Sequence, residues 1–422
     1  MGSNDTLSQD LYATTMAVKF SLRARWVLTM DGPPIERGIV TIADQCIESV
    51  GLQNSCADDL QDLGNVVLMP GLVNTHTHLE FSDQQIPLGK PRMQMADWIR
   101  QVIAARNRRG RDSAAAIHRG LQESLAAGVT TLGEIATASA SDYPLNGLPQ
   151  LIAFQEVIGF SSARQASVLA DLSNRLLNGP TDRMVGISPH APYTVHPQLL
   201  SQLVEQAVVK QLPVAMHLAE SRDELQLLAS NDGPLRDLLQ QRSMWDAESL
   251  AHSTRPLDYL KILARAPRVL VVHGNYLEPD EIRFLAEQKD HMAVVYCPRT
   301  HAFFGHIRYP LPEMLAAGVR VALGTDSRAS NPDLGLLGEM RFLFKNFPEL
   351  DSTQILSLGT LSGAAALGVA HDVGSITPGK IANLTAVACH ADVANPAKAV
   401  LQSEQSPGST WLRGKLVELP SN

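Results

Sequence analysis

Eight short apolar runs recur through the middle of the chain, and amphipathic segments separate most of them. The runs cover residues 67–78, 129–135, 151–160, 183–191, 213–220, 268–274, 292–298 and 320–327. Between them, segments such as residues 95–108, 114–128 and 197–211 repeat apolar side chains at helical spacing. Strands that alternate with helices are typical of parallel sheets. Eight such units predict an α/β fold in which a TIM-like (β/α)8 barrel closes on itself.

The rival arrangement is an open, doubly wound parallel sheet. The nucleotide-binding version of that sheet needs a Gly-x-Gly-x-x-Gly turn after its first strand. The sequence after residue 78 reads LEFSDQQ and contains no such turn. The closed barrel is therefore the better prediction.

Both ends of the chain differ in pattern from the middle. Residues 18–47, 374–389 and 409–419 are short β-rich stretches broken by Gly and Pro. Chain ends usually lie close together in space, so the simplest arrangement packs both ends into one small sheet domain. We assign residues 1–70 and 365–422 to this small domain and residues 71–364 to the barrel.

The charge balance bears on possible partners. The chain has 35 Lys and Arg against 43 Asp and Glu, a net charge of −8, so it offers no cationic footprint for nucleic acid. The one dense basic stretch, residues 106–111, follows an amphipathic run and is interpreted as a solvated helix end. No apolar run reaches the roughly 18 residues that a membrane span needs. Neither nucleic acid nor a membrane is an expected partner.

Cysteine usage bears on the compartment. Cys46, Cys56, Cys297 and Cys389 are scattered and form no Cys-x-x-Cys pair, which argues against a disulfide framework and against a thiolate zinc site. The first twenty residues contain no charged-then-apolar signal peptide. The reducing cytoplasm is the expected location.

Histidines and acidic residues collect where the predicted strands end, which in a barrel is the face that carries active sites. These residues are His76, His78, His190, His217, Glu220, His273 and Asp326. His76 and His78 are two apart on a strand, so both side chains point to one face and can bind one ion. Alone, His-x-His is equally consistent with two polar strand residues. The further residues at sibling strand ends favour a metal site.

Four motifs resemble the metal-dependent amidohydrolase superfamily: PGLVNTHTHLEF, MHLAES, VVHGNYL and GTDSRASN. The resemblance runs from about residue 66 to 340 and is closest to the branch of cytosine, guanine and S-adenosylhomocysteine deaminases. SPHAPYTV, residues 188–195, is similar to adenosine-type deaminases of that branch. The resemblance implies a distorted barrel with a small β-sandwich built from both chain ends, in agreement with the strand pattern.

The resemblance also implies that His76, His78, His217 and Asp326 hold one divalent ion, with zinc expected and iron as the alternative. Binuclear relatives place a carbamylated lysine on the fourth strand, whereas RMVGISPHAPY contains no lysine. A single ion is therefore favoured. Such an ion with an open position lets water act as a nucleophile near neutral pH.

Three residues are expected to handle protons at this site. Asp326 would accept the proton of the attacking water, and Glu220 would protonate a ring nitrogen and then the departing ammonia. His273 would stabilise the tetrahedral centre. The alternative interpretation of Glu220 is an acid that pairs with a helix N-terminus.

The substrate side of the site departs from the family pattern. His190 is a predicted substrate contact, with a structural loop histidine as the alternative, and Trp98 is either a ring-stacking wall or core. Glu80 stands where many deaminases have an apolar residue, and it is a further predicted substrate contact. Asn107 falls near the position at which ribose-binding relatives have an acidic residue.

We predict that residues 299–306 form a loop that lines the distal part of the pocket, with Arg299, Phe303 and Phe304 as substrate contacts. The alternative is an ordinary rim loop. In the pocket interpretation His301 and His306 are polar loop residues rather than buried helical ones, so they can orient the distal group, whereas in the rim-loop interpretation the two aromatic side chains are simply exposed.

HTHLEF followed by a Trp-Ile helix resembles the aminodeoxyfutalosine deaminases, whose substrate is an adenine nucleoside with a carboxyphenyl arm. Arg222, Arg299 or Arg328 could bind that carboxylate, although each arginine singly is more often solvated or paired within the protein.

The leading hypothesis is a mononuclear metal-dependent aminohydrolase that releases ammonia from an aminated heterocycle, a purine or adenosine-like compound. An aminodeoxyfutalosine deaminase, a cyclic-amide hydrolase and a catalytically dead barrel that serves as a scaffold are the alternatives. Ammonia release separates the deaminases from the other two. The expected partner is a small heterocyclic substrate, and a homo-oligomer is compatible with the sequence.

Overall fold

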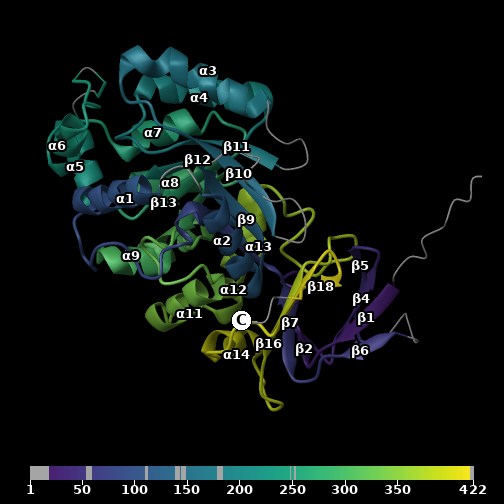
Figure 1. The fold of residues 1–422 in the computed structure, drawn as a ribbon. Coiled ribbons are helices and arrows are strands. Elements are labelled where there is room, and N and C mark those ends of the chain that lie inside the picture. Colours follow the sequence, from purple (N-terminus) through teal and green to yellow (C-terminus); the bar gives the residue numbers. More distant parts are fainter. Residues whose placement is uncertain are drawn as a thin grey trace, which may run out of the picture.

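The computed structural model describes residues 19–53, 59–109, 113–137, 143, 149–177, 184–247, 249–250 and 253–418. Cys56 and the end of the basic stretch, residues 110 and 111, lie outside these residues, as does the N-terminal part of the predicted small domain, residues 1–18. Figure 1 shows a large helix-covered barrel beside a smaller body of strands.

Eight parallel strands form the large sheet in strictly sequential order, from β8 to β15. They are β8 (Leu72–Thr77), β9 (Val129–Ala136), β10 (Gln150–Val157), β11 (Met184–Pro189), β12 (Val214–Leu218), β13 (Val269–His273), β14 (Met292–Tyr296) and β15 (Val321–Leu323). The first and last strands meet through a parallel bridge between Thr77 and Asp326, so the barrel is nearly closed. The predicted (β/α)8 barrel is confirmed.

The first predicted run contains two strands rather than one. Val66–Pro70 forms β7 in the small domain, and β8 begins at Leu72 in the barrel. Gly71 separates them and lies so close to Thr130 that an added Cβ would come within 2.3 Å of the Thr130 hydroxyl oxygen. The chain therefore passes from one domain to the other through a crowded position that only glycine fits.

Helices cover the outside of the barrel (Figure 1). They are α1 (Met95–Arg109), α2 (Ala114–Ala126), α3 (Gln165–Leu177), α4 (Pro197–Lys210), α5 (Arg222–Ser230), α6 (Pro234–Gln241), α7 (Pro256–Leu263), α8 (Pro279–Glu287), α9 (Pro298–Phe304), α10 (Leu311–Ala317), α11 (Leu336–Asn346), α12 (Ser352–Leu358), α13 (Leu361–Leu367) and α14 (Pro396–Gln402). Many begin with proline at their first position, where no intrahelical N–H bond is lost. Among the described helices, none has the length and apolarity to cross a bilayer.

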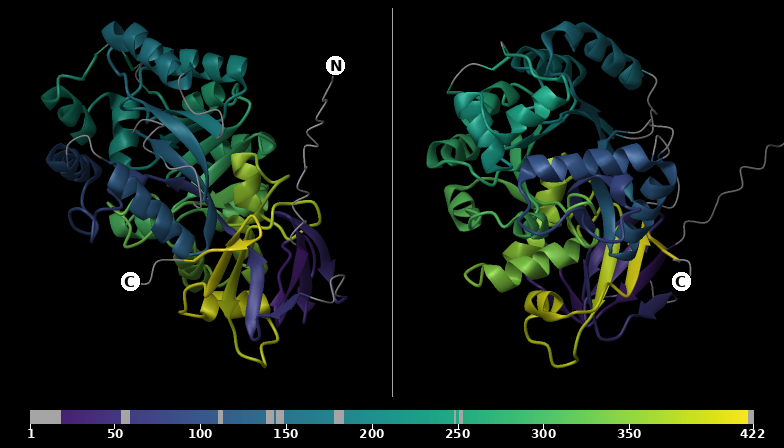
Figure 2. Two further views of the ribbon diagram at one scale, coloured as in Figure 1. Left: turned by 45° about the vertical axis from the view of Figure 1, so that its right-hand side comes forward. Right: turned by 60° about the vertical axis from the view of Figure 1, so that its left-hand side comes forward.

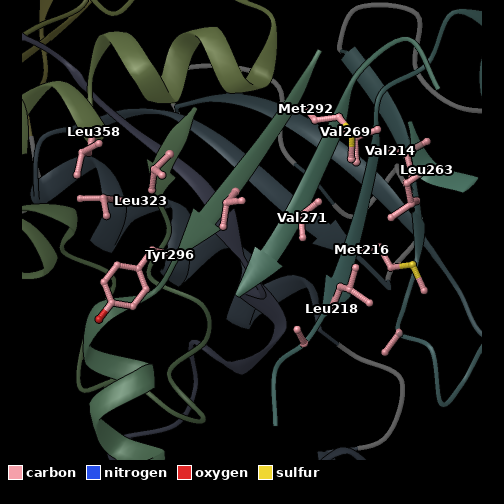
Figure 3. Close-up of a cluster of buried hydrophobic side chains, with 14 of the residues drawn as sticks. Val214, Met216, Leu218, Leu263, Val269, Val271, Met292, Tyr296, Leu323 and Leu358 are labelled. Atoms are coloured by element: carbon pink, nitrogen blue, oxygen red, sulfur yellow. The ribbon is translucent and has the colours of Figure 1, made fainter. Parts of the chain in front are cut away.

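Alternate side chains of the barrel strands enter two different cores. Val214, Met216 and Leu218 of β12 join the large cluster between the strands and the helices, which Figure 3 shows in part. Ala215, between them, joins a second cluster with Leu270 of β13, inside the barrel. Because side chains alternate along a strand, His217 shares the inner face with Ala215. The strand is buried on both faces, as expected for a helix-covered parallel sheet.

Two further sheets make the small domain (Figure 2). One has the order β5-β4-β1-β6, and the other has the order β18-β17-β16-β7-β2-β3. Their strands are β1 (Lys19–Arg23), β2 (Trp26–Val27), β3 (Ile35–Glu36), β4 (Ile39–Ala43), β5 (Cys46–Gly51), β6 (Leu60–Asp62), β7, β16 (Leu384–Ala388), β17 (Ser409–Leu412) and β18 (Lys415–Leu416).

Strands from both ends of the chain meet in this domain. β16 pairs antiparallel with β7, so a C-terminal strand lies beside an N-terminal one. Leu22, Ile42, Leu68, Leu384 and Trp411 share one buried cluster between the sheets. The predicted small sheet domain from both ends is confirmed. We keep residues 70 and 365 as its proposed boundaries.

Candidate active site

The predicted metal ligands converge at the carboxyl ends of the barrel strands. His76 lies near the end of β8, His78 directly follows that strand, and His217 lies in β12. Asp326 follows β15, and its backbone N–H donates to the carbonyl of His76 where the barrel closes. Barrel closure thus brings residues from the first, fifth and eighth strands to one point.

The distances between these side chains suit one ion. One ligand atom from each of His76, His78 and His217 lies within 4.8 Å of the others, and all three residues are buried. Asp326 Oδ1 lies 3.5 Å from His76 Nε2 and 3.6 Å from His78 Nε2. Three imidazoles and one carboxylate are a donor set typical of zinc or iron.

The ring nitrogens are prepared to act as ligands. The Nδ1–H group of His217 donates to the carbonyl of His190 over 2.8 Å, so Nε2 is the nitrogen left to bind an ion, and it lies 3.3 Å from Nε2 of His78. Both ring nitrogens of His76 and Nδ1 of His78 are buried without a hydrogen-bond partner. Burial holds the pKa of His78 and of His217 well below the usual value, so both rings are neutral. The residues present therefore fit the implied divalent ion.

Glu220 and His273 lie together beside this cluster, with 3.4 Å between Glu220 Oε1 and His273 Nε2. Burial, followed by the negative charge of Asp326, raises the pKa of Glu220 well above its usual value. The carboxyl group can therefore carry a proton at neutral pH. His273 has φ of 71°, an uncommon backbone conformation for a residue other than glycine and one found often at active sites.

A cavity of about 330 Å³ leads from the metal ligands to the surface. His78, His217, Glu220, His273 and Asp326 line its inner end. α1 and α6, which lie side by side in Figure 1, wall its outer part. An enclosed site of this size suits a small molecule.

Two of the predicted substrate contacts line this cavity. His190 does so with its Nδ1 2.7 Å from the Thr194 hydroxyl oxygen. That hydroxyl donates to the carbonyl of Ala191, so its oxygen accepts a hydrogen bond from the Nδ1–H group of His190. Trp98 also lines the cavity and donates from Nε1 to the carbonyl of Ala329. Their roles as substrate contacts remain predictions.

Arg106 corrects the interpretation of the basic stretch as a solvated helix end. Its side chain lines the cavity, and its guanidinium donates to Glu80 Oε1 over 2.6 Å. The guanidinium also lies 5.3 Å from the centre of the Phe81 ring. Trp98, Val102 and Arg106 are spaced four residues apart, so they share one face of α1. That spacing is the signal in the sequence from which Arg106 could have been recognised.

Glu80 is buried but lies outside the residues that line the cavity. Its carboxylate holds the Arg106 guanidinium instead. Glu80 therefore pairs with a residue of the cavity wall and does not itself reach the cavity, which corrects its predicted contact with substrate.

Arg299 does not line the cavity, which corrects its predicted contact with substrate. Its guanidinium donates to Glu339 Oε1 over 2.6 Å and to Asp333 Oδ2 over 2.9 Å. Glu339 has no exposed surface, so this pair holds α9 against α11. Arg299 pairs with Glu339 because the buried carboxylate would otherwise be left without a partner, which is costly. An arginine turned toward the open cavity would not compensate that charge.

Residues 298–304 form the helix α9, not the predicted loop. Phe303 and Phe304 lie outside the residues that line the cavity, which corrects their predicted place in the pocket. Phe304 meets the Trp98 ring edge to face, with 5.2 Å between ring centres, so it supports the cavity wall from behind. His301 is buried within the helix rather than polar in a loop.

The other two arginines considered for a carboxylate contact are also absent from the cavity lining. Arg328 donates from Nη1 to Glu123 over 2.7 Å, and Arg222 lies over the ring of Tyr276. Arg242, which follows α6, does line the cavity and is exposed at its mouth. The sequence pattern did not single it out, because nothing in the local sequence indicates that α6 faces α1.

A nearly closed parallel barrel with this donor set at its strand ends defines a metal-dependent enzyme of the barrel class. Residues 67–417 match the model of the amidohydrolase family. The chain belongs to this family, and the predicted resemblance is confirmed.

Relatives across most of the chain are deaminases. A 5-methylthioadenosine/S-adenosylhomocysteine deaminase of Moorella thermoacetica is 29% identical over 388 residues, covering 86% of this chain and 83% of that protein. An aminodeoxyfutalosine deaminase of Deinococcus radiodurans is 29% identical over 361 residues, covering 78% and 81%.

Solved structures have the same fold. An aminofutalosine deaminase of Helicobacter pylori with methylthio-coformycin has a TM-score of 0.81 at 22% identity and covers 94% of this chain and 100% of that one. An adenosine deaminase of Xanthomonas campestris with bound zinc has a TM-score of 0.77 at 24% identity and covers 94% and 92%.

Proposed function

We propose that this protein is a mononuclear metal-dependent aminohydrolase that removes the amino group of an adenine-type heterocycle as ammonia. The observation that carries the proposal is the buried Glu220–His273 pair beside the His76, His78, His217 and Asp326 cluster. A donor set alone would suit many reactions. A protonated carboxyl group beside it suits one in which a ring nitrogen and a leaving amine both need protons.

One zinc or iron ion held by His76, His78, His217 and Asp326 would supply the Lewis acidity that makes water nucleophilic near neutral pH. Asp326 accepts the proton of the attacking water. Ser330 donates to the other oxygen of this carboxylate, Oδ2, over 2.8 Å and so keeps Oδ1 turned toward the histidines.

Glu220 donates its proton to the ring nitrogen next to the carbon under attack, which lets that carbon become tetrahedral. Glu220 then takes up the remaining proton of the attacking oxygen and passes it to the amino group, which leaves as ammonia while the new carbonyl forms. The proton held by Asp326 returns Glu220 to its acid form. His273, 3.4 Å from Glu220, lies where it can hydrogen-bond the attacking oxygen and stabilise the charge that develops there.

The outer cavity favours a substrate with an apolar arm and an anionic end. Its α6 wall consists of Leu235, Leu238 and Leu239, and the cations Arg106 and Arg242 also line it. The two carboxylates in the described lining, Glu220 and Asp326, belong to the reaction centre. Among the relatives' named substrates, S-adenosylhomocysteine carries a carboxylate of this kind, and the aminodeoxyfutalosine hypothesis supplies another.

The test is ammonia release by the zinc-loaded protein from a panel of compounds. The panel contains adenosine, 5′-deoxyadenosine, 5-methylthioadenosine, S-adenosylhomocysteine, aminodeoxyfutalosine and a cyclic amide. We expect ammonia from adenine compounds, with the highest kcat/KM for those with an anionic arm. Ring opening of the cyclic amide without ammonia from any purine would replace the proposal by cyclic-amide hydrolysis. A protein that binds no metal and turns over nothing would be a scaffold.

The cytoplasmic location and a homo-oligomeric state remain predictions. The first is supported by the cysteine pattern: Cys46, Cys297 and Cys389, the cysteines within the described residues, are all free thiols. Gel filtration with light scattering tests the second.

A further inference from the structure

Glu134 is a buried acid of β9 that does not line the cavity, yet it binds the strand end that carries two metal ligands. The backbone N–H of Leu79 donates to both of its oxygens, over 3.1 Å to Oε1 and 3.0 Å to Oε2. The hydroxyl of Thr77 donates to Oε2 over 2.7 Å. Thr77 lies between His76 and His78, so these bonds hold the chain on both sides of His78.

Glu224 makes an equivalent arrangement at the turn that carries Glu220. It belongs to the first turn of α5 and has no exposed surface. The backbone N–H of Ala219 donates to its Oε1, and that of Glu220 donates to its Oε2, each over 2.8 Å. Ala219 has φ of 53°, an unfavourable conformation for alanine that needs such support. The carbonyl of Glu220 is held from the other side by Asn275.

We propose that Glu134 and Glu224 are positioning residues with separate tasks. Glu134 holds the metal ligands at the end of β8 in position, and Glu224 holds the proton-transferring Glu220 in position. The part that concerns Glu224 rests on the proposed function, whereas the part that concerns Glu134 requires only that the site binds a metal. Neither residue touches the reacting atoms.

The geometry of the two sites suits a side chain with two acceptor oxygens. In each, both side-chain oxygens accept hydrogen bonds from the segment that is held. A glutamine has the same shape but offers only one acceptor oxygen, and its NH2 group would face a backbone or hydroxyl donor. The substitution therefore leaves a buried donor unpaired and shifts the held segment without removing bulk.

Glu134→Gln should lower zinc affinity on the order of tenfold to a hundredfold, the usual effect of losing a partner behind metal ligands. Competition titration of the apoprotein against a zinc chelator measures this without substrate. At saturating zinc, kcat should return to within a few-fold of the wild-type value, since Glu220 is undisturbed. If Glu134→Gln does not fold, Thr77→Val removes the 2.7 Å bond to Glu134 together with the 3.1 Å contact of the same hydroxyl with the carbonyl of Gly133, and it should shift the affinity in the same direction by a smaller factor.

Glu224→Gln should leave zinc affinity unchanged and lower kcat of the fully loaded enzyme by about tenfold or more, with little change in KM. Hydrogen exchange of the Ala219 and Glu220 amides should accelerate, which reports the lost bonds independently of turnover. Each variant is thus the matched control for the other.

Glu281→Gln controls for the loss of any buried carboxylate. Glu281 is unexposed and accepts from the backbone N–H groups of Leu257 and Glu278, but it lies on α8 away from the cavity. The Glu281→Gln substitution should lower thermal stability without changing zinc affinity or kcat. Equal zinc affinity for Glu134→Gln and wild type would overturn the first half of the proposal. Unchanged kcat and unchanged amide exchange in Glu224→Gln would overturn the second.

These outcomes are distinct from a failure of the proposed function. If the wild-type protein releases no ammonia from any adenine compound, the zinc titrations and the amide exchange still decide whether each carboxylate holds its segment. If it does release ammonia, the kcat comparison is added to them.

Discussion

The carboxyl groups of Glu220 and Asp326 both line the inner end of the cavity, yet their environments drive them to opposite charge states. Burial raises the pKa of Glu220, and the nearby charge of Asp326 raises it further. For Asp326, the surrounding imidazoles outweigh burial and hold the pKa well below the usual range. One acid is therefore protonated and the other ionised at the same pH, which is how two like groups take different roles in one site.

Glu220→Gln tests the role of the protonated carboxyl. Because the amide cannot transfer a proton, kcat should fall on the order of 10² or more. Zinc content, measured by elemental analysis, should stay at one ion per chain, since Glu220 is outside the ligand set. Wild-type turnover in this variant would remove Glu220 from the mechanism, and a bound metal pair would contradict the mononuclear site.

Arg242→Ala tests the anionic end of the substrate. Arg242 lines the mouth of the cavity, so its loss should lower kcat/KM for S-adenosylhomocysteine by about tenfold, as for one charge-assisted contact. 5′-Deoxyadenosine, which has no carboxylate, should be turned over as by wild type. Arg283→Ala, on the exposed side of α8, is the control. An equal loss of kcat/KM for both substrates would show that Arg242 does not bind the carboxylate.

At the scale of elements, the site depends on how closely β8 and β9 approach each other. Their pairing has two register shifts, so the strand that carries His76 does not follow a regular ladder. Gly133 of β9 makes this irregularity fit, because an added Cβ would lie 2.4 Å from the backbone oxygen of Thr75. A side chain could rotate away from this added Cβ, but the backbone of β8 cannot.

Gly133→Ala should therefore destabilise the fold by about 1–3 kcal/mol, the usual cost of overpacking, and weaken zinc binding. Chemical denaturation of the apoprotein and the chelator competition measure the two effects. Gly51→Ala in β5 is the matched control, because nothing lies within 4 Å of its added Cβ. A Gly133→Ala protein as stable as this control would mean that β8 moves freely.

At the scale of the whole molecule, the small domain joins the two ends of the chain beside the barrel. Trp411 of β17 is buried with Leu22, Ile42 and Leu68, which come from the N-terminal strands. Its packing therefore depends on segments several hundred residues away in the sequence. The metal site lies in the other domain and does not contact it.

Trp411→Ala should lower the free energy of unfolding by about 3–5 kcal/mol, the range for removing a buried aromatic side chain. Hydrogen exchange should lose protection first in β4, β16 and β17, while zinc affinity stays at the wild-type value. Leu416→Ala, at a half-exposed position in β18, should change stability by no more than about 0.5 kcal/mol. Loss of zinc binding in Trp411→Ala would mean that the two domains unfold as one unit.

Local sequence determined the barrel and the metal donor set. Strand and helix periodicity is a property of neighbouring residues, and the rule that active sites lie at strand ends pointed to the His, Glu and Asp residues there. The resemblance of the local motifs to the amidohydrolase superfamily then singled out His76, His78, His217 and Asp326 among them. The two β-rich ends likewise predicted the small domain.

Tertiary structure alone decided which charged side chains enter the cavity. Arg299 turns to Glu339, forty residues away, while Arg106 turns inward to Glu80. Glu134 and Glu224 hold the site from positions that no motif marks. A long charged side chain can reach in several directions from one backbone position. Its direction follows the nearest unpaired partner, which only the folded chain supplies.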